Sequence, residues 1–354
     1  MFSLFLRASS ALVLSVAFFH AGFFQAAFAA DESKSTGAVI FSTSGAESVE
    51  RCWKSYSPTV FEWTCAAEHL PASAQAFALS IWVLDSPKAL LVLDTGATAS
   101  VGVAAATAIS QKFAGKPFFI LNTQPKAEHV LGNVGFKELW AKNLPAGQTF
   151  ESRLAAGQQT AKLMAQRCPD CIKLLAERMG AQAIAGTQPV IPAFALTAKR
   201  GNLGVLGIGF KPWLYELESN LDSEQTLIVR NKDMGIEWVA NLVQPQVVPD
   251  LHEGNVVERI DFLGKLHTRL HDGDKLLGSF GQIEPIWVRR NLRYFADLQL
   301  DVLTKSSQGT SEVEIINQST GDLKSAQPQL DAKSLEVHQL NVQRVYRQVE
   351  KMAF

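Results

Sequence analysis

The 354-residue sequence has no surplus of charge of either sign. It contains 33 lysines and arginines against 34 aspartates and glutamates, and no segment forms a basic stripe. A protein that binds nucleic acid needs clustered positive charge to neutralise phosphates. We therefore expect no nucleic-acid partner.

Long apolar runs are absent after residue 30. Near the N-terminus, Arg7 precedes the apolar run Ala11 to Phe28, and Ala27-Phe-Ala29 has the small residues that a signal peptidase recognises. We interpret residues 1–29 as a signal peptide, and we predict a periplasmic protein with no membrane segment in its mature form. A retained N-terminal anchor is the alternative, because the run is nearly long enough to span a bilayer.

Cysteine is scarce, with four residues in the chain. Cys52 and Cys65 are 13 positions apart, and a bridge between them would contribute roughly 3 kcal/mol by loop-closure entropy. Cys168 and Cys171 form Cys-Pro-Asp-Cys immediately ahead of the helical pattern 172–179. That pair is either a structural disulfide or a redox pair whose first thiol is acidified by a helix N-terminus. Export and the even count favour two disulfides, Cys52–Cys65 and Cys168–Cys171, although the sequence leaves three connectivities open.

The chain also lacks a second Asp-Thr-Gly. The one at Asp94-Thr-Gly96 ends a hairpin predicted from strands 80–85 and 90–94. Aspartic proteases present their catalytic carboxylate on such a turn, but they need a second one and continue as β-structure. Here the alanine-rich spacing predicts a helix over 101–113 and then a strand over 117–121. We therefore expect Asp94 and Gly96 to have a structural role.

The next segment carries a resemblance to a known fold. It reads Leu121-Asn-Thr-Gln-Pro-Lys-Ala-Glu-His-Val-Leu-Gly-Asn133. The order of strand, Asp-x-Gly turn, helix and strand before it resembles the metallo-β-lactamase superfamily, whose members continue with Thr-His-x-His-x-Asp-His and a Gly-Asn segment. On that register Gln124 and Lys126 stand where the first two metal-binding histidines would be. Glu128 replaces the aspartate, and His129 matches the last histidine.

The same register extends downstream. The His-x-His-Thr element of the superfamily corresponds to Asn220-Leu-Asp222-Ser, so that Asn220 and Asp222 take both histidine positions. Asn241 stands in place of the bridging aspartate of Gly-Asp-Leu-Val. Phe280 takes the histidine position of Pro-Gly-His-Gly. The resemblance thus implies that most of the metal ligands have been replaced.

The resemblance implies an α/β fold, the αβ/βα metallo-β-lactamase sandwich, over residues 37–290 and a helical C-terminal extension over 291–354. A closing helix is expected over 338–350. Together with Cys168-Pro-Asp-Cys171 and Pro249-Asp-Leu251, it resembles exported members associated with sulfur oxidation and quinoprotein dehydrogenase systems.

The remaining ligand types suggest little metal chemistry. A dinuclear zinc site in this fold needs about five histidines and a bridging carboxylate, because Zn²⁺ is held by imidazole nitrogen and anionic oxygen. The sequence offers Glu128, His129 and Asp222, and the ammonium of Lys126 would repel a divalent cation. We predict no cofactor, and zinc at these three residues is the alternative. Lys126 is expected to pair with Glu128 or Asp222 and to serve as the structural cation.

Two function classes follow. The first is a pseudoenzyme: a non-catalytic binding or accessory protein with a degenerate active site, whose partner is an unknown periplasmic protein or small molecule. The second is a divergent hydrolase that acts on a lactone, a thioester or another ester or amide, with one weakly bound metal or none. The replacement of nearly every ligand by a different residue type favours the first.

Overall fold

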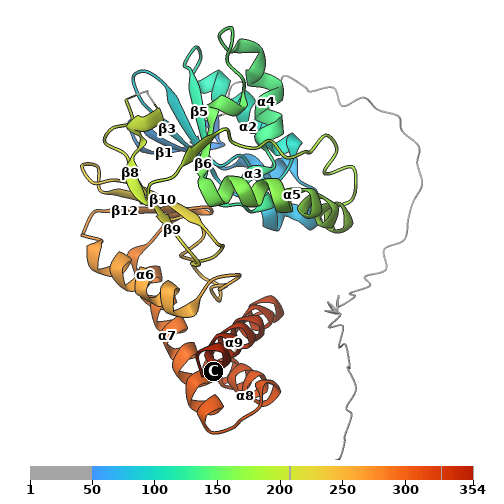
Figure 1. Ribbon diagram of the computed structural model, residues 1–354, viewed down its shortest axis with the longest axis vertical. Coiled ribbons are helices and arrows are strands. Elements are labelled where there is room, and N and C mark those ends of the chain that lie inside the picture. The colour runs from blue at the N-terminus through green and yellow to red at the C-terminus, as the bar shows by residue number, and fades with distance from the viewer. Residues whose placement is uncertain (1–49, 207–208, 328, 354) are drawn as a thin grey trace, which may run out of the picture. The chain divides into compact units, whose positions relative to one another are not determined.

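The computed structural model describes residues 50–206, 209–327 and 329–353 (Figure 1). The expected signal peptide, and residues 37–49 of the expected sandwich domain, lie outside these residues. Within the described ranges no helix combines the length and the apolar character that a membrane crossing requires.

The first sheet has seven strands that lie in the same order as in the chain. The strands are β1 (Trp53–Ser57), β2 (Val60–Trp63), β3 (Ile81–Asp85), β4 (Leu90–Leu93), β5 (Phe118–Asn122), β6 (Leu154–Gly157) and β7 (Phe194–Leu196). Neighbouring strands are antiparallel from β1 to β4 and parallel from β4 to β7. The predicted hairpin is confirmed as β3 and β4, and the strand predicted over 117–121 is confirmed as β5.

The second sheet has six strands in the order β13-β12-β11-β10-β9-β8. They are β8 (Arg200–Asn202), β9 (Leu214–Glu218), β10 (Thr226–Asn231), β11 (Ile236–Trp238), β12 (Lys275–Gly278) and β13 (Gly281–Ile283). The pair β11 and β12 is parallel, and the other pairs are antiparallel. The loops that follow β11 and β12 therefore leave the sheet at the same edge.

Helices pack on the outer face of the first sheet (Figure 1). They are α2 (Ala99–Lys112), α3 (Ala127–Val130), α4 (Asn133–Trp140) and α5 (Gln158–Met179). Short 3₁₀ helices occur at Cys65–His69, Ala72–Phe77, Ala141–Asn143, Glu151–Arg153 and Leu203–Leu206. The helix predicted over 101–113 is confirmed as α2, and Thr98 caps its start by accepting a hydrogen bond from the Val101 backbone N–H.

Side-chain alternation along the strands places the core in layers. In β3, Ile81 and Val83 face the helices, whereas Trp82 and Leu84 face the second sheet. In β10, Val229 points between the sheets. Such period-two burial on both faces is what a sheet covered on both sides requires. The order of layers is helices, sheet, sheet, helices, which is the predicted αβ/βα sandwich.

The outer face of the second sheet is covered by α6 (Val256–Arg269) and α7 (Pro285–Ser307). The chain ends in α8 (Glu312–Ala326) and α9 (Ala332–Ala353), and α9 contains the predicted closing helix. The expected domain boundary at residue 290 falls inside α7. In α9, Asn341 accepts a hydrogen bond from Leu251 N at 2.9 Å, which fastens this helix to the loop before α6.

The cysteines differ in part from expectation. Cys52 and Cys65 form a disulfide, but Cys168 and Cys171 are free thiols inside α5. Cys168 points into the core between α5 and the first sheet, whereas Cys171 is partly exposed. Because α5 begins at Gln158, the pair lies in the helix interior and not at an N-terminus that would acidify a thiol. Burial instead raises the pKa of Cys168 to about 12, which removes the basis of the redox hypothesis.

Candidate functional site

The turn after β4 is joined to the loop after β5 through Asp94. This residue has a φ of 60°, and its carboxylate is 3% exposed. Oδ1 accepts a hydrogen bond from Thr123 N at 2.8 Å, and Oδ2 accepts one from Thr123 Oγ1 at 2.6 Å. His129 Nδ1 lies 2.7 Å from the same Oδ2. The Asp94 carboxylate therefore holds both Thr123 and His129 and so orients the segment between them.

His129 is fully buried against this carboxylate. Burial opposes the charged form of its imidazole, but the adjacent Asp94 outweighs burial and raises the pKa of His129. Its other ring nitrogen, Nε2, is buried and has no hydrogen-bond partner among the described residues. The Nδ1 side of the imidazole is thus fixed by Asp94, whereas the Nε2 side has no partner among the described residues.

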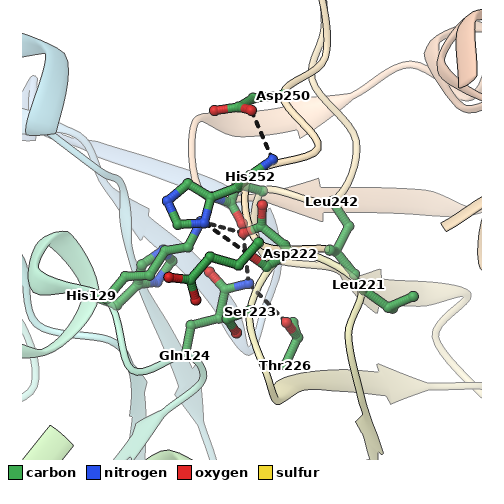
Figure 2. A network of polar contacts seen from close by, with 12 residues as sticks. Gln124, His129, Leu221, Asp222, Ser223, Thr226, Leu242, Asp250 and His252 are labelled. Carbon is green, nitrogen blue, oxygen red and sulfur yellow. Dashed lines mark hydrogen bonds and ion pairs between the residues drawn. The ribbon is translucent and has the colours of Figure 1, made fainter. Parts of the chain in front are cut away.

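Asp222 lies opposite, in the loop between β9 and β10, and it is the centre of a polar network (Figure 2). Lys126 Nζ forms an ion pair and hydrogen bond with Asp222 Oδ2. Gln124 Nε2 donates to the same oxygen at 3.2 Å and to Thr226 Oγ1 at 3.0 Å. Lys126 and Gln124, from one predicted segment, therefore both contact Asp222, which lies about a hundred residues downstream.

A second cation, the guanidinium of Arg259, also pairs with Asp222. Arg259, on α6, is fully buried, and its Nη2 lies 3.4 Å from Asp222 Oδ1. Its Nε donates to Leu221 O at 2.7 Å, and its Nη1 donates to Leu242 O at 3.0 Å. The guanidinium also lies 5.5 Å from the ring centroid of Phe295. The buried guanidinium of Arg259 is therefore hydrogen-bonded, paired with a carboxylate and packed on an aromatic ring, which offsets the cost of burying its charge.

The two cations set the charge state of Asp222. Burial alone would raise the pKa of this carboxyl, but the charges of Lys126 and Arg259 outweigh burial and lower the pKa to about 2. Asp222 is thus ionised at neutral pH. One carboxylate between two cations leaves the network with a net positive charge and no need of a further cation.

The network reaches the C-terminal helices through His252. Its ring Nδ1 lies 3.0 Å from Asp222 O, and its backbone N–H donates to Asp250 Oδ1 at 2.8 Å (Figure 2). Arg344, on α9, pairs with that same Asp250 oxygen at 2.6 Å. A chain of polar contacts therefore connects Asp222 with α9.

The other predicted site residues do not join the network. Glu128 is partly buried, and its carboxylate makes no ion pair or hydrogen bond within the described part of the chain. Asn220 is exposed in a turn at a φ of 55°, and its Nδ2 lies 3.5 Å from Glu258 Oε1. The ring of Phe280 is 58% exposed between β12 and β13. Of the two expected partners of Lys126, the structure brings Asp222 to it and not Glu128.

Several buried polar atoms at this edge of the two sheets have no partner among the described residues. They are Gln124 Oε1, His129 Nε2, Asn241 Oδ1 and Ser279 Oγ. The residues follow β5, β11 and β12, whose loops hold the predicted site. Leaving a buried polar atom unpaired costs about 1–3 kcal/mol, so this edge has hydrogen-bonding capacity for water or a polar ligand.

The described residues do not gather the predicted metal ligands. In this part of the chain, the side chains of His, Cys, Asp or Glu that bring three ligand atoms within 4.8 Å of one another are Cys52, Cys65 and Glu68. The two cysteines are joined by a disulfide, so their sulfurs are not thiolate ligands. Glu128, His129 and Asp222 form no such group.

Among the residues of this network that sequence reasoning missed are Arg259, Thr226 and His252. Arg259 occupies the buried face of α6 together with Val256 and Leu263. An arginine at a position of the apolar stripe was the available signal, because such a charge needs a buried partner. Thr226 starts β10 and offered no comparable signal.

Comparison with known proteins rests on structure. No family model matches the sequence, and no curated protein matches it. A double mutant of the sec-alkyl sulfatase PisA1 matches with a TM-score of 0.60 at 11% identity, over 84% of this chain and 50% of that chain. The chain thus spans about half of the sulfatase.

Two metallo-β-lactamases also match. The enzyme from Pontibacter korlensis has a TM-score of 0.48 at 11% identity, over 69% of this chain and 98% of that chain. DIM-1 has a TM-score of 0.48 at 11% identity, over 69% and 96%. The sulfatase match and the observed order of layers lead to one conclusion: the chain has the metallo-β-lactamase fold.

Proposed function

We propose that this chain is an exported, non-catalytic protein on a hydrolase fold, and that it acts by binding a partner. The observation that carries the proposal is the buried ion pair between Lys126 and Asp222. On the register of the superfamily both residues stand at histidine ligand positions. An ammonium held at this place supplies the positive charge that a metal would otherwise supply.

Zinc does not fit the residues at this place. Zinc sites use neutral imidazoles and anionic oxygen or sulfur, whereas Lys126 presents a cation and Gln124 presents an amide. The one acid of the network, Asp222, is already neutralised by Lys126 and Arg259. A divalent ion would either have to displace the buried ammonium of Lys126 or be repelled by it.

The binding surface that we propose is the rim of this site. Phe280 stands at the last ligand position on the register, and its ring is 58% exposed. The turn that holds it is fixed, because Ser80 N donates to Ser279 O at 2.8 Å and Ser279 N donates to Ala240 O at 2.9 Å. A large ring presented on a fixed turn suits contact with a partner, since little backbone freedom is lost on binding.

Export and the partner class are part of the same proposal. The disulfide between Cys52 and Cys65 fits an oxidising compartment such as the periplasm. The resemblance to exported members associated with sulfur oxidation and quinoprotein dehydrogenase systems makes soluble components of such systems the first partners to test.

A divergent hydrolase with one metal remains the second candidate, and a specific observation favours it. His129 Nε2 is buried without a partner, and the Glu128 carboxylate beside it is unpaired among the described residues. An imidazole and a carboxylate are two ligands that a catalytic zinc would use.

One experiment separates the two functions. The metal content of the purified mature protein is measured together with turnover of a lactone, a thioester and a β-lactam. The proposal expects substoichiometric zinc and no turnover that depends on added zinc. One tightly held zinc per chain, lost in His129→Ala together with hydrolysis of any of the three substrates, would establish the second candidate instead.

A further inference from the structure

Two free thiols lie on one turn of α5, outside the network around Asp222 (Figure 1). Cys168 and Cys171 are three positions apart, and such residues are neighbours on a helix, with Cβ atoms about 5–6 Å apart. Because side chains on a helix are tilted toward its N-terminus, the side chain of Cys171 leans toward Cys168. The two sulfurs therefore share one face of α5.

The face that carries the two thiols is turned toward the core. Cys168 is fully buried in the apolar cluster that also contains Met164 and Leu175, from the same face of α5. Burial raises the pKa of the Cys168 thiol, and the charge of a Cys171 thiolate raises this pKa further, an interaction that requires the two sulfurs to be near each other. Cys171 is partly exposed. One thiol is thus sheltered, and the other is accessible from solvent.

Pro169 lies between the two cysteines and loosens this turn of the helix. A proline has no N–H, so the helix lacks the hydrogen bond that position 169 would donate to the carbonyl of Ala165. The turn can therefore adjust while the two sulfurs close on a metal ion.

The donor atoms suit a soft metal ion of low coordination number. Thiolate ligands favour Cu(I) and zinc among the metals that proteins bind. Zinc needs three or four protein ligands. Within the described ranges, no side chain of His, Asp or Glu joins both sulfurs in a group of three ligand atoms within 4.8 Å. Cu(I) is satisfied by two thiolates on opposite sides of the ion, so it is the ion that this pair fits.

The charges near Cys171 have opposite effects on a thiolate. Burial and the carboxylate of Glu128, on the neighbouring helix α3, raise the pKa of Cys171, whereas the guanidinium of Arg167 opposes this shift. A Cu(I) ion between two thiolates carries a net negative charge. Glu128 should therefore disfavour the complex, unless its carboxylate is itself a ligand.

We infer that Cys168 and Cys171 form a binding site for Cu(I), in which the two thiolates hold the ion between them on the core face of α5. Binding releases the two thiol protons to solvent, and the metal keeps its oxidation state. The accessible Cys171 receives the ion, and the buried Cys168 completes the site. The inference is independent of the proposed function, because it uses neither Lys126 nor Asp222.

The test is an anaerobic competition for Cu(I) between the mature protein and the chromophoric chelator bicinchoninate. The protein is expected to withdraw one Cu(I) per chain from the chelator. Cys168→Ala and Cys171→Ser should each weaken binding by about 100-fold or more, because a single thiolate loses the advantage of a linked second ligand. Cys171→Ser changes a partly exposed position, so it keeps the test decisive if Cys168→Ala does not fold.

Met179→Leu is the matched control, because Met179 is a buried sulfur residue of α5 that lies about two turns beyond Cys171. It should leave the affinity unchanged. Glu128→Gln should bind Cu(I) at least as tightly as the unmodified protein, because it removes a negative charge beside the complex. Circular dichroism establishes that each variant is folded.

Three results would overturn the inference. The first is that the unmodified protein takes no Cu(I) from the chelator. The second is that Cys171→Ser keeps the full affinity, since one thiolate would then be sufficient. The third is that Glu128→Gln binds Cu(I) more weakly, since the Glu128 carboxylate would then be a ligand and the site would not consist of the two thiolates.

Discussion

Lys126 and Asp222 are 96 positions apart in the sequence, yet the ammonium of one is bonded to the carboxylate of the other in the interior of the fold. The Lys126 side chain is 11% exposed and that of Asp222 is 1% exposed. The pair joins the loop after β5 in the first sheet to the loop before β10 in the second. It therefore connects the two halves of the sandwich at the place where we propose that a metal site has been replaced.

The first prediction is that Lys126→Met lowers the free energy of unfolding by about 2 to 4 kcal/mol, because it leaves the buried Asp222 short of one counter-charge. Urea denaturation of the two proteins at neutral pH measures the difference. Lys173→Met is the matched control, since the Lys173–Asp170 pair has side chains that are 78% and 83% exposed. The control should change stability by less than about 0.5 kcal/mol.

A double variant makes this prediction sharper. If Asp222 is the partner of Lys126, then Lys126→Met combined with Asp222→Asn should cost less than the sum of the two single changes. Additive costs would mean that the pair is not coupled in solution, and the assignment of Lys126 as the structural cation would have to be abandoned.

The second prediction concerns the cysteines. Thiol titration of the unfolded, non-reduced mature protein should find two free thiols, those of Cys168 and Cys171, because Cys52 and Cys65 are bridged. The same assay on the folded protein should find Cys168 unreactive, since burial raises the pKa of its thiol. A count of zero in the unfolded protein would show that the helix interior does allow a bridge between Cys168 and Cys171.

The hairpin, α2, β5 and α9 were predictable because each is encoded locally. Alternating apolar residues specify β3 and β4, and an alanine-rich helical spacing specifies α2. The start of α5 was not predictable in this way. The sequence pattern predicted a helix over 172–179, after Cys-Pro-Asp-Cys, yet Pro169 lies inside α5, which begins at Gln158. Burial of Met164 and Leu175 on one face of α5 outweighs the hydrogen bond that the proline removes.

The site was predictable only as a set of positions. The register placed Lys126 near an acid, but it could not choose between Glu128 and Asp222, because that choice depends on how two distant loops approach each other. Arg259 was missed because a charge on a helix is normally solvated. The Arg259 guanidinium is instead fully buried, together with its apolar neighbours on the same face of α6.

The third prediction concerns acid stability and His338 on α9. This ring lies between Tyr294 Oη at 2.9 Å and Ser319 Oγ at 3.2 Å, with Asp301 and Lys305 acting on it from α7. Burial lowers the pKa of His338 below that of an unfolded histidine. The unfolded chain then binds more protons, so this stabilisation is complete above about pH 6.5 and is lost as the pH falls.

Urea denaturation at pH 7 and pH 5 tests this expectation. The unmodified protein should lose more stability between these values than His338→Gln, which has no titrating group at this position. Parallel losses in the two proteins would show that His338 does not contribute to acid sensitivity.

Thermal unfolding in chelator and in zinc tests most directly the proposal that the Lys126 ammonium has replaced a metal. A ligand that binds only the folded state raises its stability in proportion to the logarithm of ligand concentration over the dissociation constant. We expect the same unfolding midpoint for the mature protein in excess EDTA and in excess zinc. A midpoint several degrees higher in zinc, abolished by His129→Ala and unaffected by Lys173→Met, would contradict it.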